Sequence, residues 1–269
     1  MSVDDLFNYE DNWVTAMGAW YPGEKVIFRN HDLFNELNEI SWMELMLYGI
    51  TGRRFNQQQI ELFNRMWVLC TSYPDPRIWN NRIAALAGTV RSTCSLAIGA
   101  ATAISEATIY GRRPDIRAID FLQKTQTKLE NGEDLDDLVV AEIKKYRGIA
   151  GYGRPIINAD ERIAPITNEM EKLGFKDGTY IKLAFSVEKS LQKTPWPLAM
   201  NVGAVLAALA ADQGLTPKQH YQFMTLCFSA GMFPCYIDAL NNPEGSFFPL
   251  RCERIQYEGK PKRKWQSTK

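Results

Sequence analysis

Arginine side chains stand beside glycine-containing turns at two places in this 269-residue sequence. Arg112 and Arg113 follow Gly111, and Arg154 follows the turn Gly151-Tyr152-Gly153. Guanidinium groups bind carboxylate and phosphate oxygens through paired hydrogen bonds, and glycines leave backbone amides open to the same anions. The sequence therefore predicts a cradle for a carboxylate or a phosphate. Ordinary surface turns are the competing interpretation.

Metal-binding residues are few. The two histidines, His31 and His220, and the five cysteines have no metal-ligand spacing, so we expect no metal site. We expect the cysteines to be buried, reduced thiols. They are Cys70, Cys94, Cys227, Cys235 and Cys252.

Charge and hydropathy exclude several classes of partner. Lys plus Arg and Asp plus Glu are each 31, so the formal net charge is 0 and no basic field favours nucleic acid or an anionic membrane. The apolar stretch 94–109 is interrupted by polar residues and is too short to span a bilayer. The first residues, Met-Ser-Val-Asp-Asp, lack the basic and apolar regions of a signal peptide. We expect a cytoplasmic protein that binds neither nucleic acid nor membrane.

The elements that must position these arginines are predicted to be helices, because apolar residues recur mostly at helical intervals along the chain. Apolar residues recur at helical intervals from Ile60 to Cys70, behind Asn56 and Gln59, which have the spacing of an N-cap and its capping-box partner. A Thr-Pro-Lys-Gln sequence precedes a second apolar run, 223–240, and has the same start signal with proline at the first helical position. Both patterns predict helices.

Composition divides the chain into two units. The segments 83–106 and 202–211 are rich in Ala, Gly and Ser, which predicts closely packed central helices. Charged amphipathic helical patterns lie between them. We therefore predict an all-α fold in which residues 1–113 and 195–269 form a large domain and residues 114–194 form a smaller inserted domain. A ligand is expected in the cleft between them.

Five motifs, in order and spacing, resemble the short citrate synthase or citryl-CoA lyase type over nearly the whole chain. They are Asn30-His31-Asp32-Leu33 with the Ile-Thr-Gly-Arg turn ending at Arg53; Arg82-Ile83-Ala84-Ala85-Leu86-Ala87-Gly88; Gly151-Tyr152-Gly153-Arg154-Pro155 with Asp160 and Arg162; Asn201-Val202-Gly203-Ala204; and Arg254-x-x-Tyr257-x-Gly259. The resemblance implies the citrate synthase-like version of the all-α fold.

Chemistry next to a thioester carbonyl requires a base, a donor for the enolate oxygen and cations for carboxylates. The family uses one aspartate, two histidines and several arginines, and this sequence departs from that pattern. At the position of the family's first histidine this sequence has Tyr110, whose phenol can donate a hydrogen bond but is a poor base. The second is replaced by Arg154, which stabilises an anion but cannot shuttle a proton. The aspartate falls on Gly203, or on Ala199 if the alignment has a gap.

The resemblance also assigns binding residues. The family's carboxylate-binding arginine appears as Phe228, and the first arginine of the C-terminal pair falls near Cys252. The implied catalytic residues are Tyr110 and Arg154. The implied substrate-binding residues are Arg112, Arg113, Arg251, Arg254 and Asn201. The implied coenzyme A-binding residues are Gly151, Tyr152, Gly153, Asp160 and Arg162.

Three interpretations of the function stay open. The first is a diverged enzyme that forms or cleaves carbon–carbon bonds on a CoA thioester or other carboxylated anion, without a tightly bound cofactor and without ordinary citrate synthesis. It needs another base, such as Asp75 or Glu106. The second is a non-catalytic homologue that serves as a partner or regulatory subunit, in a homodimer or heterodimer, because the family dimerises through large-domain helices. The third is unrelated chemistry on the same fold.

Overall fold

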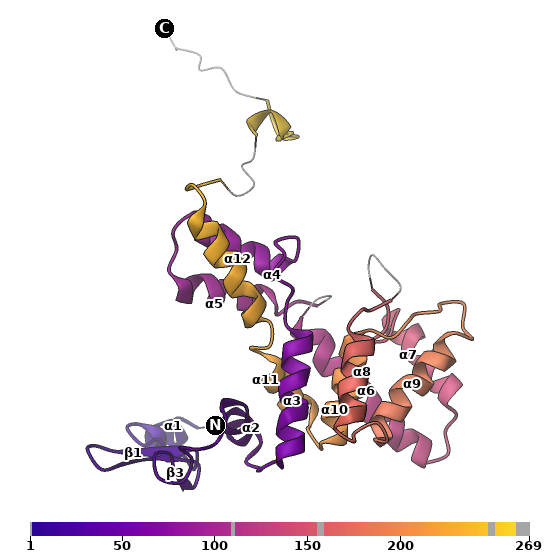
Figure 1. The fold of residues 1–269 in the computed structure, drawn as a ribbon, viewed down its shortest axis with the longest axis horizontal. Coiled ribbons are helices and arrows are strands. Elements are labelled where there is room, and N and C mark those ends of the chain that lie inside the picture. Colours follow the sequence, from indigo (N-terminus) through magenta and orange to yellow (C-terminus); the bar gives the residue numbers. More distant parts are fainter. Residues whose placement is uncertain (1, 109–110, 155–158, 247–250, 262–269) are drawn as a thin grey trace.

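The computed structural model describes residues 2–108, 111–154, 159–246 and 251–261, and most of these residues lie in helices (Figure 1). The larger group of helices consists of α2 (Trp42–Thr51), α3 (Gln57–Cys70), α6 (Arg112–Glu130), α7 (Leu135–Tyr146), α8 (Ile163–Lys172), α9 (Thr179–Leu191), α10 (Val202–Asp212) and α11 (Pro217–Met224). The smaller group consists of α4 (Trp79–Thr89), α5 (Cys94–Ile104) and α12 (Ser229–Asn241). The predicted all-α class is confirmed.

The larger group encloses one hydrophobic core, centred on α10. Val202 and every residue from Ala204 to Ala211 are buried, and the helix packs against α6 and α9. This confirms the prediction of a central helix over 202–211. The core also includes side chains from α2, α3, α7, α8 and α11, and so draws on both predicted domains. The domain boundaries at 114 and 194 stay a prediction.

Local start signals predicted two of these helices correctly. Asn56 and Gln59 form the capping box of α3, with Asn56 Oδ1 accepting from the Gln59 amide at 2.9 Å. Thr216 and Gln219 form the capping box of α11, with Pro217 as the first helical residue. These caps satisfy amides that the first turn of a helix leaves unpaired.

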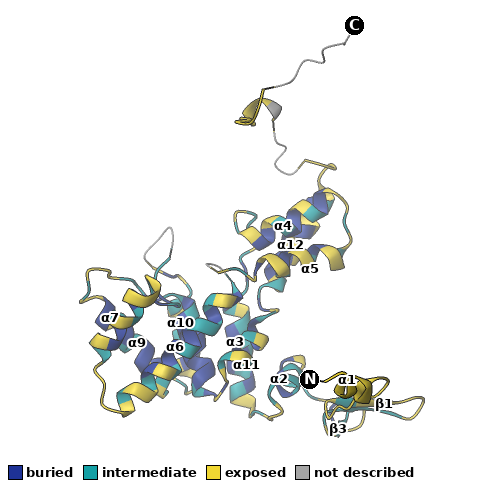
Figure 2. Cartoon of the chain, turned by 180° about the vertical axis from the view of Figure 1, so that it is seen from behind, coloured by how far each residue is buried: buried dark blue, intermediate teal, exposed yellow. Residues whose placement is uncertain are grey.

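The smaller group has a separate core of small residues. A Cβ added at Gly88 of α4 would lie 2.6 Å from the carbonyl oxygen of Tyr236 on α12, so only glycine allows this close approach. In α5 only Ala97 and Ala101 are buried, Cys94 and Ile98 are partly buried against the same core, and most of the other residues are exposed (Figure 2). The sequence predicted a buried central helix here, and within this chain that prediction is wrong for α5.

A small antiparallel sheet near the N-terminus escaped the sequence analysis. Its strands are β1 (Gly18–Tyr21), β2 (Lys25–Phe28) and β3 (His31–Asp32), paired in the order β1-β2-β3, and α1 (Val3–Tyr9) lies beside it. Most of these residues are exposed or half-buried. Strands this short and this exposed show no alternation of apolar and polar residues.

One helical stretch of the described chain, Pro217–Asn241, is long and apolar enough to cross a membrane by length and composition. A turn at 225–228 divides it into α11 and α12, and 44% of its apolar window is buried. The first half packs on α6 and the second on α4. Core helices pass the same test of length and hydropathy.

The described cysteines form no disulfide. Cys70, Cys94, Cys227 and Cys235 are free thiols, and all but Cys94 are buried. Burial raises the pKa of Cys227 to about 12 and also raises that of Cys70, so both stay protonated and unreactive. This agrees with the predicted buried, reduced thiols.

Candidate functional site

Arg112 is the first residue of α6 and its side chain is almost fully buried, at 4% exposure. Its Nη1 atom donates to the carbonyl oxygen of Met224 at 2.7 Å and lies 2.9 Å from Oδ2 of Asp115. The guanidinium also lies on the ring of Phe228, 3.9 Å from its centroid. Arg112 is therefore not solvated, whereas Arg113, the next residue of α6, has 61% of its side chain exposed, with Glu106 4.0 Å away.

Two titratable groups beside Arg112 were missed by the sequence analysis. Burial raises the pKa of the Asp115 carboxyl, against the opposing charges of Arg112 and Arg162, and among the described residues its Oδ2 atom has no partner other than the Arg112 guanidinium. Burial, and then the charge of Arg112, lower the pKa of His220 to about 3. Neither ring nitrogen of His220 has a hydrogen-bond partner. Both are buried by tertiary packing between helices, which the spacing of residues along the chain does not show.

Asp160 and Arg162 form a tight ion pair at the N-terminus of α10. Oδ1 and Oδ2 of Asp160 accept from Nε and Nη2 of Arg162, both at 2.8 Å, and Oδ2 also accepts from the amide of Val202 at 2.9 Å. Burial acts to raise the pKa of Asp160, but these hydrogen bonds outweigh it and the pKa falls below its ordinary value. Asp160 thus joins the 160–162 segment to α10.

Arg154 is held by acidic neighbours. Its Nη1 atom donates to Oε2 of Glu161 at 2.5 Å and to the carbonyl oxygen of Ala159 at 3.0 Å, and it lies 3.8 Å from Asp160. The hydroxyl of Tyr73 donates to the other Glu161 oxygen at 2.7 Å. Hydrogen bonds from Arg154, and to a smaller extent from the Glu161 amide and Tyr73, lower the pKa of Glu161 to about 2. The side chain of Arg154 keeps 23% of its surface exposed.

The Gly-x-Gly turn docks on the segment before α10. Gly153 donates its amide to Ala199 at 2.6 Å, Asn201 donates its amide to Gly151 at 2.9 Å, and Asn201 Nδ2 donates to Gly153 at 2.8 Å. Gly151 has φ +91°, and a Cβ there would lie 2.8 Å from the Ala204 backbone. The amides of Gly153 and Asn201 are therefore used within the fold, and their role in ligand binding stays a prediction.

Tyr152 faces the core. It is buried, and its hydroxyl donates to the carbonyl oxygen of Ala184 at 2.8 Å. Burial raises the pKa of its phenol, so this tyrosine stays protonated.

The remaining predicted residues do not join this region within one chain. Arg251 and Arg254 are exposed, in and beside the short 3₁₀ helix η1 (Cys252–Arg254), which lies away from the other helices beyond α12 (Figure 1). Tyr110 lies outside the described residues. The catalytic role assigned to Tyr110 and the substrate-binding roles of Arg251 and Arg254 therefore stay predictions.

No family model and no curated protein matches the sequence. Solved structures match it along most of its length. Citryl-CoA lyase from Hydrogenobacter thermophilus has a TM-score of 0.81 at 18% identity, covering 94% of this chain and 97% of the other. An ATP citrate lyase variant from Methanosaeta concilii, in complex with (3S)-citryl-CoA, has a TM-score of 0.74 at 14% identity over 97% of this chain and 45% of the other. Citrate synthase from Thermotoga maritima MSB8 has a TM-score of 0.61 at 17% identity over 84% and 60%.

The chain has the citrate synthase fold. The predicted citrate synthase-like architecture is thereby confirmed, and the chain spans less than half the length of the ATP citrate lyase. The replacement of the catalytic residues stays a prediction.

Within this citrate synthase fold, four charged residues form what we call the polar junction: Arg112, Asp115, Asp160 and Arg162. The charge of Arg162 lowers the pKa of Asp115, and the charges of Asp115 and Asp160 raise that of Cys70 at the end of α3. The starts of α6 and α10 and the end of α3 therefore meet around these four groups. Cations and a carboxyl of raised pKa are the groups that proton abstraction next to a carbonyl requires.

The two alternative bases differ in place and charge. Glu106 lies beside the junction, because its charge raises the pKa of Asp115, and it accepts from the hydroxyl of Tyr221 at 2.8 Å. Asp75 is bound by both ends of the Arg77 guanidinium, which lowers its pKa to about 2 and makes it a weak base. Among the described residues, no cluster of three or more His, Cys, Asp or Glu could hold a metal ion.

Proposed function

We propose that the chain is an enzyme that binds a CoA thioester or another carboxylated anion and forms or cleaves a carbon–carbon bond, by a route that differs from ordinary citrate synthesis. The observation that carries the proposal is the buried ion pair of Asp115 with Arg112, whose Oδ2 and Nη1 atoms lie 2.9 Å apart and in which burial raises the pKa of the carboxyl. The likeness in fold to citryl-CoA lyase over nearly the whole of both chains supports it.

The roles follow from the charges. A carboxylate with a raised pKa accepts a proton more readily than an ordinary one, so Asp115 is assigned as the base. Arg112 and Arg162 stabilise the negative charge that develops on the thioester oxygen. Arg154, with a partly exposed guanidinium, binds a substrate carboxylate. The neighbouring structures contain citryl-CoA, or citrate with coenzyme A, which suggests the substrate class.

Proton exchange tests this proposal without knowledge of the second substrate. Acetyl-CoA is incubated with the protein in D₂O, and proton NMR follows the replacement of methyl C–H by C–D. We expect exchange above the uncatalysed rate, and a loss of about a hundredfold or more in Asp115→Asn. The matched control is Glu130→Gln, an exposed carboxylate at the other end of α6. Calorimetric titration that detects no acetyl-CoA binding at millimolar concentration contradicts the proposal.

A second function, pairing with another copy or with a related chain, is supported by an exposed apolar face on α4, α5 and α12. Gly99 at the middle of α5 has open space where a Cβ would lie, and the face leaves large side chains in solvent. Large apolar side chains left exposed on one group of helices are typical of protein interfaces. Its exposed members are Leu86, Val90, Leu96, Ile104, Phe233 and Ile237.

Light scattering after size-exclusion chromatography tests the pairing. We expect a dimer at micromolar concentration and a monomer for Leu96→Glu, because a buried carboxylate in the interface has no partner. Val14→Glu, which changes an exposed apolar residue outside this face, is the control and leaves the dimer intact. A monomeric wild-type chain rules out pairing with itself. Pairing without proton exchange favours the non-catalytic partner over the enzyme.

A further inference from the structure

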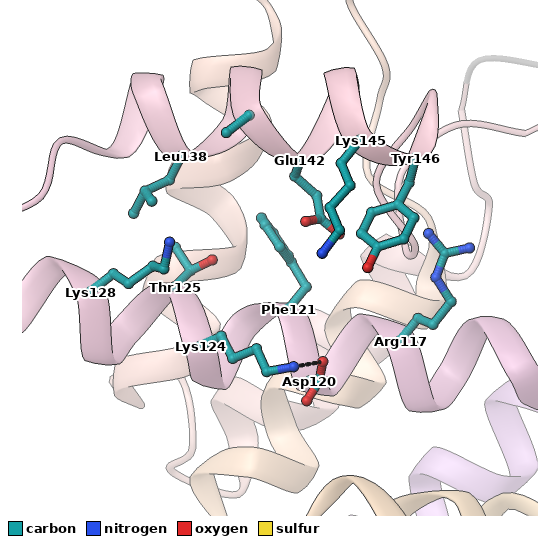
Figure 3. A pocket seen from close by; sticks show the side chains of 11 residues that line it. Arg117, Asp120, Phe121, Lys124, Thr125, Lys128, Leu138, Glu142, Lys145 and Tyr146 are labelled. Atoms are coloured by element: carbon teal, nitrogen blue, oxygen red, sulfur yellow. Dashed lines mark hydrogen bonds and ion pairs between the residues drawn. The ribbon is translucent and has the colours of Figure 1, made fainter.

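A cavity of about 290 Å³ lies between α6 and α7, on a different face of α6 from the polar junction (Figure 3). Asp115 and Arg117 are two residues apart, so their side chains point in nearly opposite directions around the helix. Nothing in the proposed reaction uses this cavity. Its lining combines cations with aromatic and aliphatic side chains.

The cavity carries an excess of positive charge. Arg117, Lys124, Lys128 and Lys145 line it, but only two carboxylates do, in a chain whose formal net charge is 0. Lys124 is neutralised by Asp120 at 2.6 Å, and Lys128 lies 3.6 Å from Glu133, outside the cavity. In the described part of the chain, no carboxylate lies within ion-pair distance of Arg117 or Lys145.

The unneutralised cations gather at one end. The guanidinium carbon of Arg117 lies 4.6 Å from the centre of the Tyr146 ring, and Nζ of Lys145 lies 4.8 Å from the same centre. Glu142 and Asp120 are the carboxyls drawn near them; burial raises the pKa of Glu142 while Arg117 and Lys145 oppose that shift, and Asp120 is paired with Lys124. Two cations held on one ring, neither of them in an ion pair with a described residue, favour an added anion.

The centre of the cavity is apolar. The ring of Phe121 points into it between the cationic end and Thr125, and Leu138 extends toward it from α7 (Figure 3). A flat ring can stack on Phe121. The volume lies at the lower limit of ligand pockets, which are about 300–1,000 Å³, so it suits one nucleoside rather than a dinucleotide.

We propose that this cavity binds a nucleoside monophosphate, with the phosphate on Arg117 and Lys145 and the base on Phe121. A phosphate monoester carries a charge of about −1.5 to −2 at neutral pH, which matches the two uncompensated cations. The site is distinct from the polar junction and binds its ligand without any chemical step.

Calorimetry on the full chain, with AMP, adenosine and inorganic phosphate as separate probes, tests the proposal. We expect AMP to bind at least tenfold more tightly than either part alone, because the ring and the phosphate are both recognised. Arg117→Gln weakens AMP binding at least tenfold. Lys144→Gln, which removes an exposed cation of α7 outside the cavity, leaves it unchanged.

Further measurements distinguish AMP binding at this cavity from acetyl-CoA binding at the polar junction. Phe121→Leu keeps an apolar side chain in the core, weakens AMP, and leaves the weak binding of phosphate unchanged. Acetyl-CoA binding stays the same in Arg117→Gln. The proposal is overturned if AMP binds no more tightly than phosphate, if Arg117→Gln and Lys144→Gln behave alike, or if acetyl-CoA displaces AMP.

Discussion

Acid should destabilise this protein through one side chain, His220, at pH values where carboxylates are still ionised. Its imidazole is fully buried on α11, neither nitrogen has a hydrogen-bond partner, and its pKa is lowered from 6.5 to about 3. Between these two values the unfolded chain binds a proton that the folded chain does not. Stability therefore falls as the pH falls from 6.5 toward 3.

The size of the effect follows from the two pKa values. Between pH 7.5 and 5.5, a group with an unfolded pKa of 6.5 that stays neutral in the folded state lowers the free energy of unfolding by about 1.4 kcal/mol. The carboxyl of Asp115 has a raised pKa, so its protonation acts in the opposite sense. Because Asp115 is present in every protein compared, its contribution largely cancels between wild type and a His220 variant.

Urea unfolding at pH 7.5 and 5.5 measures the contribution of His220 to the free energy of unfolding. When the pH falls from 7.5 to 5.5, the free energy of unfolding of the wild type should fall by about 1.4 kcal/mol more than that of His220→Leu. His220→Gln, also non-titrating, is a second variant in case leucine packs badly. His220→Leu should also gain about 1 kcal/mol at pH 7.5, because it removes two buried polar atoms without partners. Parallel pH dependence in wild type and both variants would refute the reasoning.

Three further changes test the packing around the site, each followed by urea unfolding. Gly151→Ala should lower the free energy of unfolding by about 2 kcal/mol or more, because its Cβ meets the α10 backbone at positive φ, whereas Gly132→Ala, with open space, should cost only about 1 kcal/mol. Arg112→Met should cost about 3 kcal/mol by leaving Asp115 buried without its cation, and adding Asp115→Leu should restore most of the loss. Thr216→Ala should cost about 1 kcal/mol through the lost cap of α11, with acetyl-CoA binding unchanged.

Elements with local signals were predictable from the sequence. The α3 and α11 helices carry capping boxes, so a few consecutive residues determine where each begins. The α10 helix is apolar on all sides and could only be buried. The same composition misled for α5, because nothing local distinguishes a helix covered by its own chain from one whose apolar face stays open.

The site was predictable only in part. Asp160 and Arg162 bind each other, and Asp160 binds the start of α10, 42 positions along the chain, which the sequence did not predict; their role in ligand binding stays a prediction. Arg112 was expected at a turn and is buried against Phe228. The burial of Asp115 and His220 depends on how α6, α3 and α11 pack together, and no spacing within a single helix encodes that arrangement.

In the described chain, the hydrophobic core around α10 shares no side chain with the two smaller clusters that hold α4 against α5 and α12. We therefore expect the two groups of helices to open separately, each with its own opening free energy. Amide hydrogen exchange would resolve them, with slow exchange in α10 and faster exchange in α4 and α12. Equilibrium unfolding would then follow a three-state scheme, in which the small-residue unit melts first.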